Sequence, residues 1–382
     1  MKKSLGVLFS IISFSLILTA CSSQKEKKKK KNASKLVLQV KYAKGFEIEQ
    51  LKEEKKLIIK LPYPNSKEQF EYILNDVSSS KIVSQKSISI TTPIKRIVVT
   101  STTHIPMLEL LGVENTLVGF PHTSYVSSTK TRNRINNGEI KEIGRKESLN
   151  TEILLELQPD VVIGFSMNKA NKALRLVEKS GIPVILNGDW LEETPLGRAE
   201  WIKFFGVLFN KEKEADSIFN SIEANYLSAI ELAKKSNSRP SVLSGAVMSK
   251  DIWNLPAGES FVAHFLKDAK TNYLWKESKG KGSLSISFES VLNKGKNADY
   301  WIAPGYFSSK KQLLKSNSYY QEFLAFKKNH IYTFSNKIGE TGGVIYFELG
   351  PTRPDLVLKD IIKITHPNLL KNYSLTFFEK MN

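Results

Sequence analysis

The hydrophobic and polar positions between Lys211 and Lys235 form the most regular pattern of the chain. Apolar residues recur there at steps of three and four, which predicts an amphipathic helix. They are Ala215, Phe219, Ile222, Tyr226, Ile230 and Ala233. We expect Asn210 to cap the N-terminus of this helix, and a rise of about 1.5 Å per residue gives a length of roughly 37 Å. Such a helix either joins two lobes as a spine or belongs to a single large domain, and the flanking patterns favour the spine.

Short apolar runs and amphipathic stretches alternate on both sides of this helix. Before it, strands are expected at 96–101, 116–120, 161–165 and 182–188, and helices at 102–112, 151–158 and 171–181. After it, strands are expected at 240–247, 298–305 and 330–335, and helices at 260–268, 285–295, 319–328 and 354–364. Strands that alternate with helices predict a mostly parallel sheet in each half.

The predicted fold class is therefore α/β, with two Rossmann-like lobes joined by a single long spine helix. The N-terminal lobe is expected at 94–196, the linker and spine helix at 197–238, and the C-terminal lobe at 239–382. A small β-rich N-terminal extension precedes them at 36–93, where β-branched residues alternate with polar ones. We assign no chemistry to this extension.

The two halves also resemble each other in sequence. Residues 148–163 align with residues 285–302 if two additional residues are allowed in the second stretch. The matched pairs are the N-cap types Asn150 and Ser287, the helical Glu152 and Glu289, and Asp160 and Asp299 before the next strand. A capped helix can occur twice by chance in an α/β protein, but the matching order within each half indicates two related lobes.

Candidate ligand contacts follow from the predicted sheets, because ligands of open α/β sheets bind beyond the carboxyl ends of the strands. The candidates are Tyr125, Arg145, Phe165, Trp190, Trp253, Tyr306, Phe307 and Arg353. We expect Trp253 and Arg353 on the C-terminal side of a cleft, with Tyr125, Arg145 and Trp190 opposite. Aromatic side chains suit a large, partly apolar ligand. Each one alone is more often a packing residue than a ligand contact, but their recurrence at strand ends of both lobes strengthens the case for ligand contacts.

Catalytic and metal-binding motifs are absent from the sequence. It contains no G-x-G-x-x-G, P-loop or G-x-S-x-G pattern, and its five histidines have no metal-ligand spacing. A single cysteine excludes an intrachain disulfide. We therefore expect neither enzymatic activity nor a resident metal or cofactor.

The N-terminal residues differ in character from the rest. A short apolar run after Lys2 and Lys3 ends in Leu-Thr-Ala-Cys21, which resembles the lipobox of bacterial lipoproteins. The resemblance implies a signal peptide at 1–20 and acylation of Cys21; an ordinary signal peptide is the alternative. Residues 1–35 hold nine lysines and one glutamate, so eight of the +18 net charge lie there. We expect 21–35 to be a disordered tether at a membrane surface, and the remaining charge indicates no nucleic-acid partner.

Together these features resemble the class III periplasmic binding proteins of ABC importers, which serve ferric siderophores, haem and cobalamin. The resemblance covers roughly residues 94–370. It lies in KRIVVTSTTHIPMLELLG, SLNTEILLELQPDVVIG, WNLPAGESFVAHFLKDA and SFESVLNKGKNADYWI, while PLGRAEWIKFFG and RPDLVLKDIIKI look like a Bacteroidetes-type branch. The family implies a rigid cleft, a permease dimer as partner, a monomeric protein in the periplasm, and docking through Glu152 and Glu289.

The ligand type remains open between three metal chelates. Cobalamin-binding members carry an aromatic residue six positions before each docking glutamate, where this chain has Lys146 and Ser283. Arg145, Lys146 and Arg353 near the cleft favour an anionic ferric siderophore. We therefore predict a lipid-anchored protein that delivers a ferric siderophore to an ABC permease. The alternatives are a cobalamin or haem carrier, an enzyme on the same fold, and a surface lipoprotein without a transported ligand.

Overall fold

The computed structural model describes residues 38–50, 54–77, 88–145, 148–168 and 171–382. The predicted signal peptide, the tether with Cys21, and Lys146 lie outside these residues. Within them, no helix is both long enough and apolar enough to cross a membrane.

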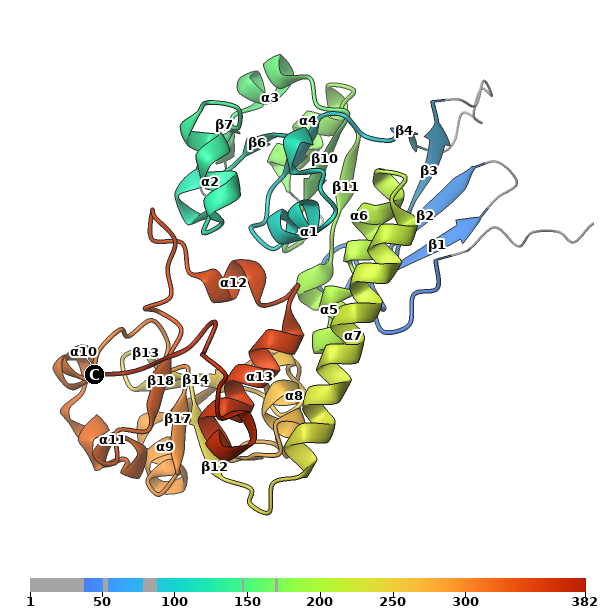
Figure 1. Ribbon diagram of the computed structural model, residues 1–382. Coiled ribbons are helices and arrows are strands. Elements are labelled where there is room, and N and C mark those ends of the chain that lie inside the picture. The colour runs from blue at the N-terminus through green and yellow to red at the C-terminus, as the bar shows by residue number, and fades with distance from the viewer. Residues whose placement is uncertain (1–37, 51–53, 78–87, 146–147, 169–170) are drawn as a thin grey trace, which may run out of the picture. The chain divides into compact units, whose positions relative to one another are not determined.

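The N-terminal lobe contains a parallel five-stranded sheet in the order β11-β10-β5-β6-β7 (Figure 1). Its strands are β5 (Ile97–Val99), β6 (Leu117–Phe120), β7 (Lys141–Glu142), β10 (Val161–Gly164) and β11 (Val184–Leu186). Its helices are α1 (His104–Leu110), α2 (Thr129–Asn136), α3 (Thr151–Leu157) and α4 (Lys172–Lys179), and a short hairpin pairs β8 (Gly144–Arg145) with β9 (Ser148–Leu149). Strands β5, β6 and β10 are buried along their whole length, as expected of a sheet covered on both faces.

The C-terminal lobe contains a second five-stranded sheet in the order β15-β12-β17-β18-β19, parallel except for β19. Its strands are β12 (Ser241–Ser244), β15 (Asn272–Tyr273), β17 (Tyr300–Ile302), β18 (Ile331–Thr333) and β19 (Glu379–Lys380). Its helices are α8 (Phe261–Asp268), α9 (Phe288–Gly295), α10 (Lys310–Ser316), α11 (Leu324–Lys327), α12 (Ile345–Leu349) and α13 (Pro354–Thr365). Short 3-10 helices occur on both sides of the spine helix. Those before it are η1 (Glu114–Thr116), η2 (Thr123–Tyr125) and η3 (Asp189–Leu191), and those after it are η4 (Ser318–Glu322) and η5 (Pro367–Leu370).

Two predicted helices of this lobe are partly wrong. Residues 285–287 belong to β16 (Ser283–Ser287), which joins β13 (Ala246–Ser249) and β14 (Ile252–Pro256) in a small antiparallel sheet, so α9 begins only at Phe288. The alternation in Ser-Leu-Ser-Ile-Ser has the period of a strand rather than a helix. The helix predicted at 319–328 is divided by Phe323, whose backbone is extended and whose side chain is fully buried.

The internal repeat corresponds to a repeat of topology. The order β6-β5-β10-β11 in the first lobe matches β15-β12-β17-β18 in the second. The paired aspartates also have matching contacts, since Asp160 accepts the backbone N–H groups of Lys95 and Arg96 at 2.7 and 2.8 Å, and Asp299 accepts that of Ser241 at 2.8 Å. Asp160 therefore connects the start of β10 to the start of β5, and Asp299 connects the start of β17 to the start of β12.

The long helix α7 (Glu212–Lys234) is confirmed as the spine between the lobes. Ala215, Phe219 and Ile222 in its first half are buried in the core of the N-terminal lobe, and Tyr226, Ala229 and Ala233 in its second half are buried in the core of the C-terminal lobe. It follows α5 (Pro195–Ala199) and α6 (Ile202–Leu208). The predicted cap is wrong, because Asn210 has a left-handed backbone with φ of 55° and its amide donates to Asp76. The N-cap is Lys211, whose side chain makes no capping bond.

The N-terminal extension forms a four-stranded sheet in the order β1-β2-β3-β4. Its strands are β1 (Phe46–Gln50), β2 (Lys55–Ile59), β3 (Phe70–Asp76) and β4 (Ile88–Thr92). Phe46, Leu57 and Tyr72 are buried in the same core cluster as Val99 and Phe205 of the N-terminal lobe. The extension is thus built into that lobe through a shared hydrophobic core.

Residues 38–45, which we term the strap, run from the first described residue to β1 and are held by buried carboxylates. Glu200 accepts the backbone N–H groups of Lys41, Tyr42 and Ala43 at 2.6–3.0 Å. Glu192 accepts the backbone N–H groups of Lys44 and Gly45 in the same way. These donors have no strand partner, so the carboxylates satisfy polar groups that would otherwise be costly to bury.

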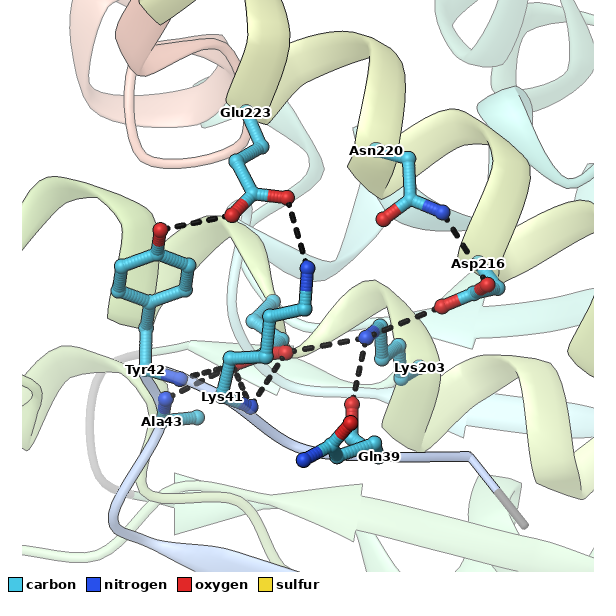
Figure 2. A network of polar contacts seen from close by, with 9 residues as sticks. Gln39, Lys41, Tyr42, Ala43, Lys203, Asp216, Asn220 and Glu223 are labelled. Atoms are coloured by element: carbon cyan, nitrogen blue, oxygen red, sulfur yellow. Dashed lines mark hydrogen bonds and ion pairs between the residues drawn. The ribbon is translucent and has the colours of Figure 1, made fainter. Parts of the chain in front are cut away.

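Lys203 completes the attachment of the strap (Figure 2). Its ammonium group donates to the carbonyl of Gln39 at 2.7 Å and pairs with Glu200 at 3.0 Å and Asp216 at 3.1 Å. The side chains of Lys203 and Glu200 are 1% and 0% exposed. The strap therefore connects the extension to α6 and to the spine helix through a buried charge network.

Candidate functional site

Each lobe has a cavity at the carboxyl ends of its parallel strands. The N-terminal cavity, of about 680 Å³, is lined by residues that follow β5, β6 and β10. The C-terminal cavity, of about 580 Å³, is lined by residues that follow β12, β17 and β18. The cavities thus occupy corresponding edges of the two repeated sheets, where ligands of open α/β sheets bind.

The N-terminal cavity contains two of the predicted aromatic residues. Tyr125, in η2, is 61% exposed and its ring stacks on that of His122 with 5.4 Å between centroids. Phe165, directly after β10, is 41% exposed and meets Trp190 edge-on at 6.3 Å. Trp190 contacts the ring of Phe165 but does not line the cavity. Its buried indole N–H has no hydrogen-bond partner among the described residues. Tyr125 and Phe165 therefore present accessible aromatic surfaces to this cavity.

The C-terminal cavity is mostly apolar and contains one half-buried guanidinium, that of Arg198 in α5. Arg198 lies over the ring of Phe261 at 3.8 Å and donates to the carbonyls of Glu192 and Trp190 at 3.1 and 2.9 Å. No carboxylate of the described residues pairs with it. Burial lowers the pKa of Arg198, although the nearby Asp189 carboxylate partly opposes that effect. A half-buried cation without an anionic partner favours binding of an anionic group in this cavity.

Both lobes contribute to the C-terminal cavity. Thr103, after β5 of the N-terminal lobe, is part of its lining, and the hydroxyl of Thr103 donates to Asp189 at 2.7 Å. Lys281 also lines the cavity and forms an ion pair with Glu193 of the linker. The cavity is thus bounded by residues from both halves of the repeat.

The other predicted cleft residues do not themselves line either cavity among the described side chains. Tyr306 is 65% exposed and contacts Phe334 and Phe347, which line the C-terminal cavity. Phe307 is half-buried and packs against Tyr320. Arg145 lies in β8, but its side chain is outside the part of the structure that is described.

Trp253 and Arg353 do not occupy the positions that the sequence suggested. Trp253 has no exposed surface, stacks on Trp301 at 5.2 Å and donates to the carbonyl of Ser244 at 3.0 Å. It lies on the buried face of β14, so it is a core residue. Arg353 makes a two-fold interaction with Asp355, with both N–O distances 2.9 Å, at the start of α13. Neither residue lines either cavity, and the charge of Arg353 is already neutralised.

The two predicted docking carboxylates occupy equivalent exposed positions. Glu152 and Glu289 are each the second residue of their helices, α3 and α9. The side chains of Asn150 and Ser287 cap these helices, as predicted. Within the described residues neither carboxylate has an ion-pair partner, so both are available to solvent or to a partner protein.

The C-terminal cavity has the features of a small-molecule binding site. In the described parts of the chain, no three His, Cys, Asp or Glu residues are grouped so that they could hold a metal ion. An apolar cavity wall with one convergent cation suits a ligand that has a bulky apolar body and an anionic group. Arg198 was not among the sequence candidates. The available signal was a single arginine in the otherwise mostly apolar Pro-Leu-Gly-Arg-Ala stretch, 195–199.

Comparison with known proteins identifies relatives of the chain. A family model described as periplasmic binding protein matches residues 97–337. The uncharacterized lipoprotein MJ0878 of Methanocaldococcus jannaschii is 25% identical over 100% of this chain and 97% of its own length.

Solved structures share the fold at low sequence identity. A periplasmic binding protein from Veillonella parvula has a TM-score of 0.59 at 17% identity, covering 86% of this chain and 97% of its own. A possible iron-binding protein from Staphylococcus epidermidis has a TM-score of 0.56 at 20% identity, covering 72% and 100%. A periplasmic heme-binding protein from Pseudomonas aeruginosa has a TM-score of 0.56 at 19% identity, covering 76% and 98%. These likenesses confirm the predicted fold class.

Proposed function

Because the chain belongs to the periplasmic binding protein family, we propose that it captures a ferric siderophore in its cleft and delivers it to an ABC permease. The observation that carries the choice of ligand is the half-buried Arg198, which has no carboxylate partner among the described residues, in the mostly apolar C-terminal cavity. A ferric siderophore combines a bulky organic body with an anionic metal centre or carboxylate, and arginine recognises such groups through paired N–H donors. Haem, with a flat apolar ring and two carboxylates, is the second candidate for the same reasons.

The two relatives with iron-related descriptions support this class of ligand without defining it. The Staphylococcus epidermidis protein is described as possibly iron-binding and the Pseudomonas aeruginosa protein as heme-binding. Aromatic Tyr125 and Phe165 in the facing cavity supply surfaces for a conjugated ligand. The Bacteroidetes-type branch that the sequence resembles stays a prediction.

The ligand can be identified from the visible absorbance and mass of the compound that copurifies with the protein. Titration of the empty protein with a ferric tricatecholate, haemin and cyanocobalamin, followed by quenching of tryptophan fluorescence, then ranks the candidates. We expect the ferric tricatecholate to bind most tightly. Saturable binding of cobalamin alone would overturn the proposal, and chemical conversion of a bound chelate would instead support an enzyme.

Docking to the permease is proposed to occur through Glu152 and Glu289. One exposed carboxylate on each lobe can meet one basic cluster on each of two permease subunits, which fixes the orientation of the complex. Glu152→Lys, Glu289→Lys and the double variant should lose uptake progressively, more strongly at low salt, while ligand affinity stays unchanged. Normal uptake by the double variant would mean that the two acids only complement their helix dipoles, an effect of roughly 0.3–1 kcal/mol.

The membrane anchor is proposed to be the acylated thiol of Cys21, which lies outside the described residues. The lipobox-like sequence before it and the lipoprotein description of the relative from Methanocaldococcus jannaschii support this proposal. Such an anchor places the protein at the outer side of the cytoplasmic membrane or elsewhere in the periplasm. Cys21→Ser should abolish incorporation of labelled palmitate. Labelling that persists in this variant would exclude Cys21 as the acylated residue.

A further inference from the structure

A hairpin loop of the C-terminal lobe contacts the N-terminal lobe directly. Residues 338–344, which we term the tongue, begin and end at a bridge between Ile338 and Val344. Near its tip, the hydroxyl of Thr341 donates to the carbonyl of Ser124 at 2.8 Å and accepts from Arg132 at 3.3 Å. Two hydrogen bonds therefore join the tongue to the segment around η2 and α2.

Glu348 makes a second and stronger contact between the lobes. It lies in α12, four residues after the tongue, and is 2% exposed. Its two carboxylate oxygens accept the backbone N–H groups of Ser127 and Ser128 at 2.7 and 2.8 Å. Figure 1 shows α12 beside α1, at the boundary of the two lobes. Both oxygens of one buried carboxyl group therefore contact consecutive backbone N–H groups of the other lobe.

The tongue fits closely against the same segment. A Cβ atom added to Gly343 would lie 2.2 Å from the carbonyl oxygen of Tyr125, and one added to Gly339 would lie 2.6 Å from the Cα atom of Ser127. No side chain can be placed at either glycine without moving the lobes apart locally. The contact is thus matched in shape as well as in polar groups.

This contact is continuous with both cavities. Tyr346 and Phe347 of α12 line the C-terminal cavity, and Tyr125 lines the N-terminal cavity. We propose that Glu348 and the tongue form a proton-sensitive latch that holds the two lobes together beside the cleft, and that release of this latch opens the cleft for ligand exchange. The role in ligand exchange rests on the proposed function, whereas the latch itself does not.

Burial of Glu348 is the main reason that protons control the latch, and neighbouring groups modify its effect. Glu109 on α1 acts on Glu348 through its charge, Arg132 on α2 donates to Thr341 of the tongue, and Arg198 on α5 acts on Tyr346 of α12. The tongue also carries Glu340, α1 the buried His104, α2 Lys130 and Arg134, and α13 begins with the Arg353–Asp355 pair and also holds Lys359, Asp360 and Lys363. Burial raises the pKa of Glu348 to about 7, the bonds from Ser127 and Ser128 oppose this effect, and the charge of Glu109 adds to it.

The direction of the pH effect follows from linkage. When the latch opens, water solvates Glu348 and its pKa falls toward the ordinary value of about 4.5. The closed form therefore binds a proton more tightly than the open form does. Closure is most favoured below about pH 4.5, and this contribution is lost as the pH rises through about 7.

Hydrogen–deuterium exchange at the amides of Ser127 and Ser128 tests the latch in the full-length protein, without ligand or permease. After correction for intrinsic exchange, the protection factor should be about 30-fold greater at pH 5.5 than at pH 8.5, because the effect grows about tenfold for each pH unit below the closed-form pKa of about 7. Glu348→Gln should remove this pH dependence. Gly343→Ala should reduce protection at both pH values, because the added methyl group separates the surfaces without changing a charge.

Two controls make the result decisive. Glu340→Gln changes an exposed acid of the tongue that lies apart from the carboxylate contact, and should behave as the unmodified protein does. The amides of β10, which is buried along its whole length within the N-terminal sheet, report whether each variant is folded. The proposal is overturned if the unmodified protein shows equal protection at both pH values, or if Glu348→Gln retains the pH dependence. Because no ligand is present, these outcomes are independent of whether the ferric siderophore proposal holds.

Discussion

Replacement of Glu200 by alanine is expected to lower the free energy of unfolding by about 3–5 kcal/mol, because it removes one partner of a buried ion pair. Lys203, which is 1% exposed, would keep only Asp216 and the carbonyl of Gln39 as partners. The backbone N–H groups of the strap would lose their acceptor as well. Glu200→Gln keeps one oxygen acceptor and should lose about 1–3 kcal/mol. The measurement is urea denaturation, with midpoint and slope fitted separately.

The matched control is a carboxylate of the spine helix that is exposed. Glu231 pairs with Lys234, and both side chains are more than 60% exposed. Glu231→Ala should therefore change the free energy of unfolding by less than about 0.5 kcal/mol. If Glu200→Ala unfolds at the same urea concentration as Glu231→Ala, the strap network does not stabilise the fold and the buried ion pair is dispensable.

The sequence could predict those features that depend on local periodicity. The spine helix was predictable because both halves of α7 bury one face, so the period of the apolar residues continues from one lobe into the next. The helices capped by Asn150 and Ser287 were predictable for the same reason, since a cap and the residues that follow it are neighbours in sequence. The fold class follows from these local patterns together with the alternation of strands and helices.

Features that depend on distant contacts were not predictable. The strap has a strand-like sequence, but its partner Glu200 lies 157–159 positions away and belongs to another element. Trp253 was misplaced because an aromatic residue after a strand can belong to a following strand; here it lies on the buried face of β14. Arg353 was misplaced because Asp355, only two residues later, neutralises it. Such outcomes are decided by tertiary packing rather than by residue type.

The contrast between Arg198 and Arg353 leads to the second prediction. Both are half-buried arginines, but only Arg198 lines a cavity and lacks a carboxylate partner among the described residues. Arg198→Met keeps most of the apolar contact with Phe261 and removes the charge. It should weaken binding of an anionic ferric tricatecholate by about 10- to 100-fold, the loss expected for a hydrogen bond to a charged group. Arg198→Lys should recover only part of this affinity, because lysine lacks the paired donors.

Arg353→Met supplies the control for charge, and Trp253→Phe the control for packing. Arg353→Met should lower stability, since it leaves the buried Asp355 unpaired, yet it should bind the ferric tricatecholate with unchanged affinity. Trp253→Phe removes the hydrogen bond to Ser244 and should cost about 1–3 kcal/mol of stability, again without a change in affinity. Fluorescence titration at one pH measures all variants, and chemical denaturation separates stability from binding. If Arg353→Met weakens binding more than Arg198→Met does, the anion site lies at the start of α13 and the cavity around Arg198 serves another purpose.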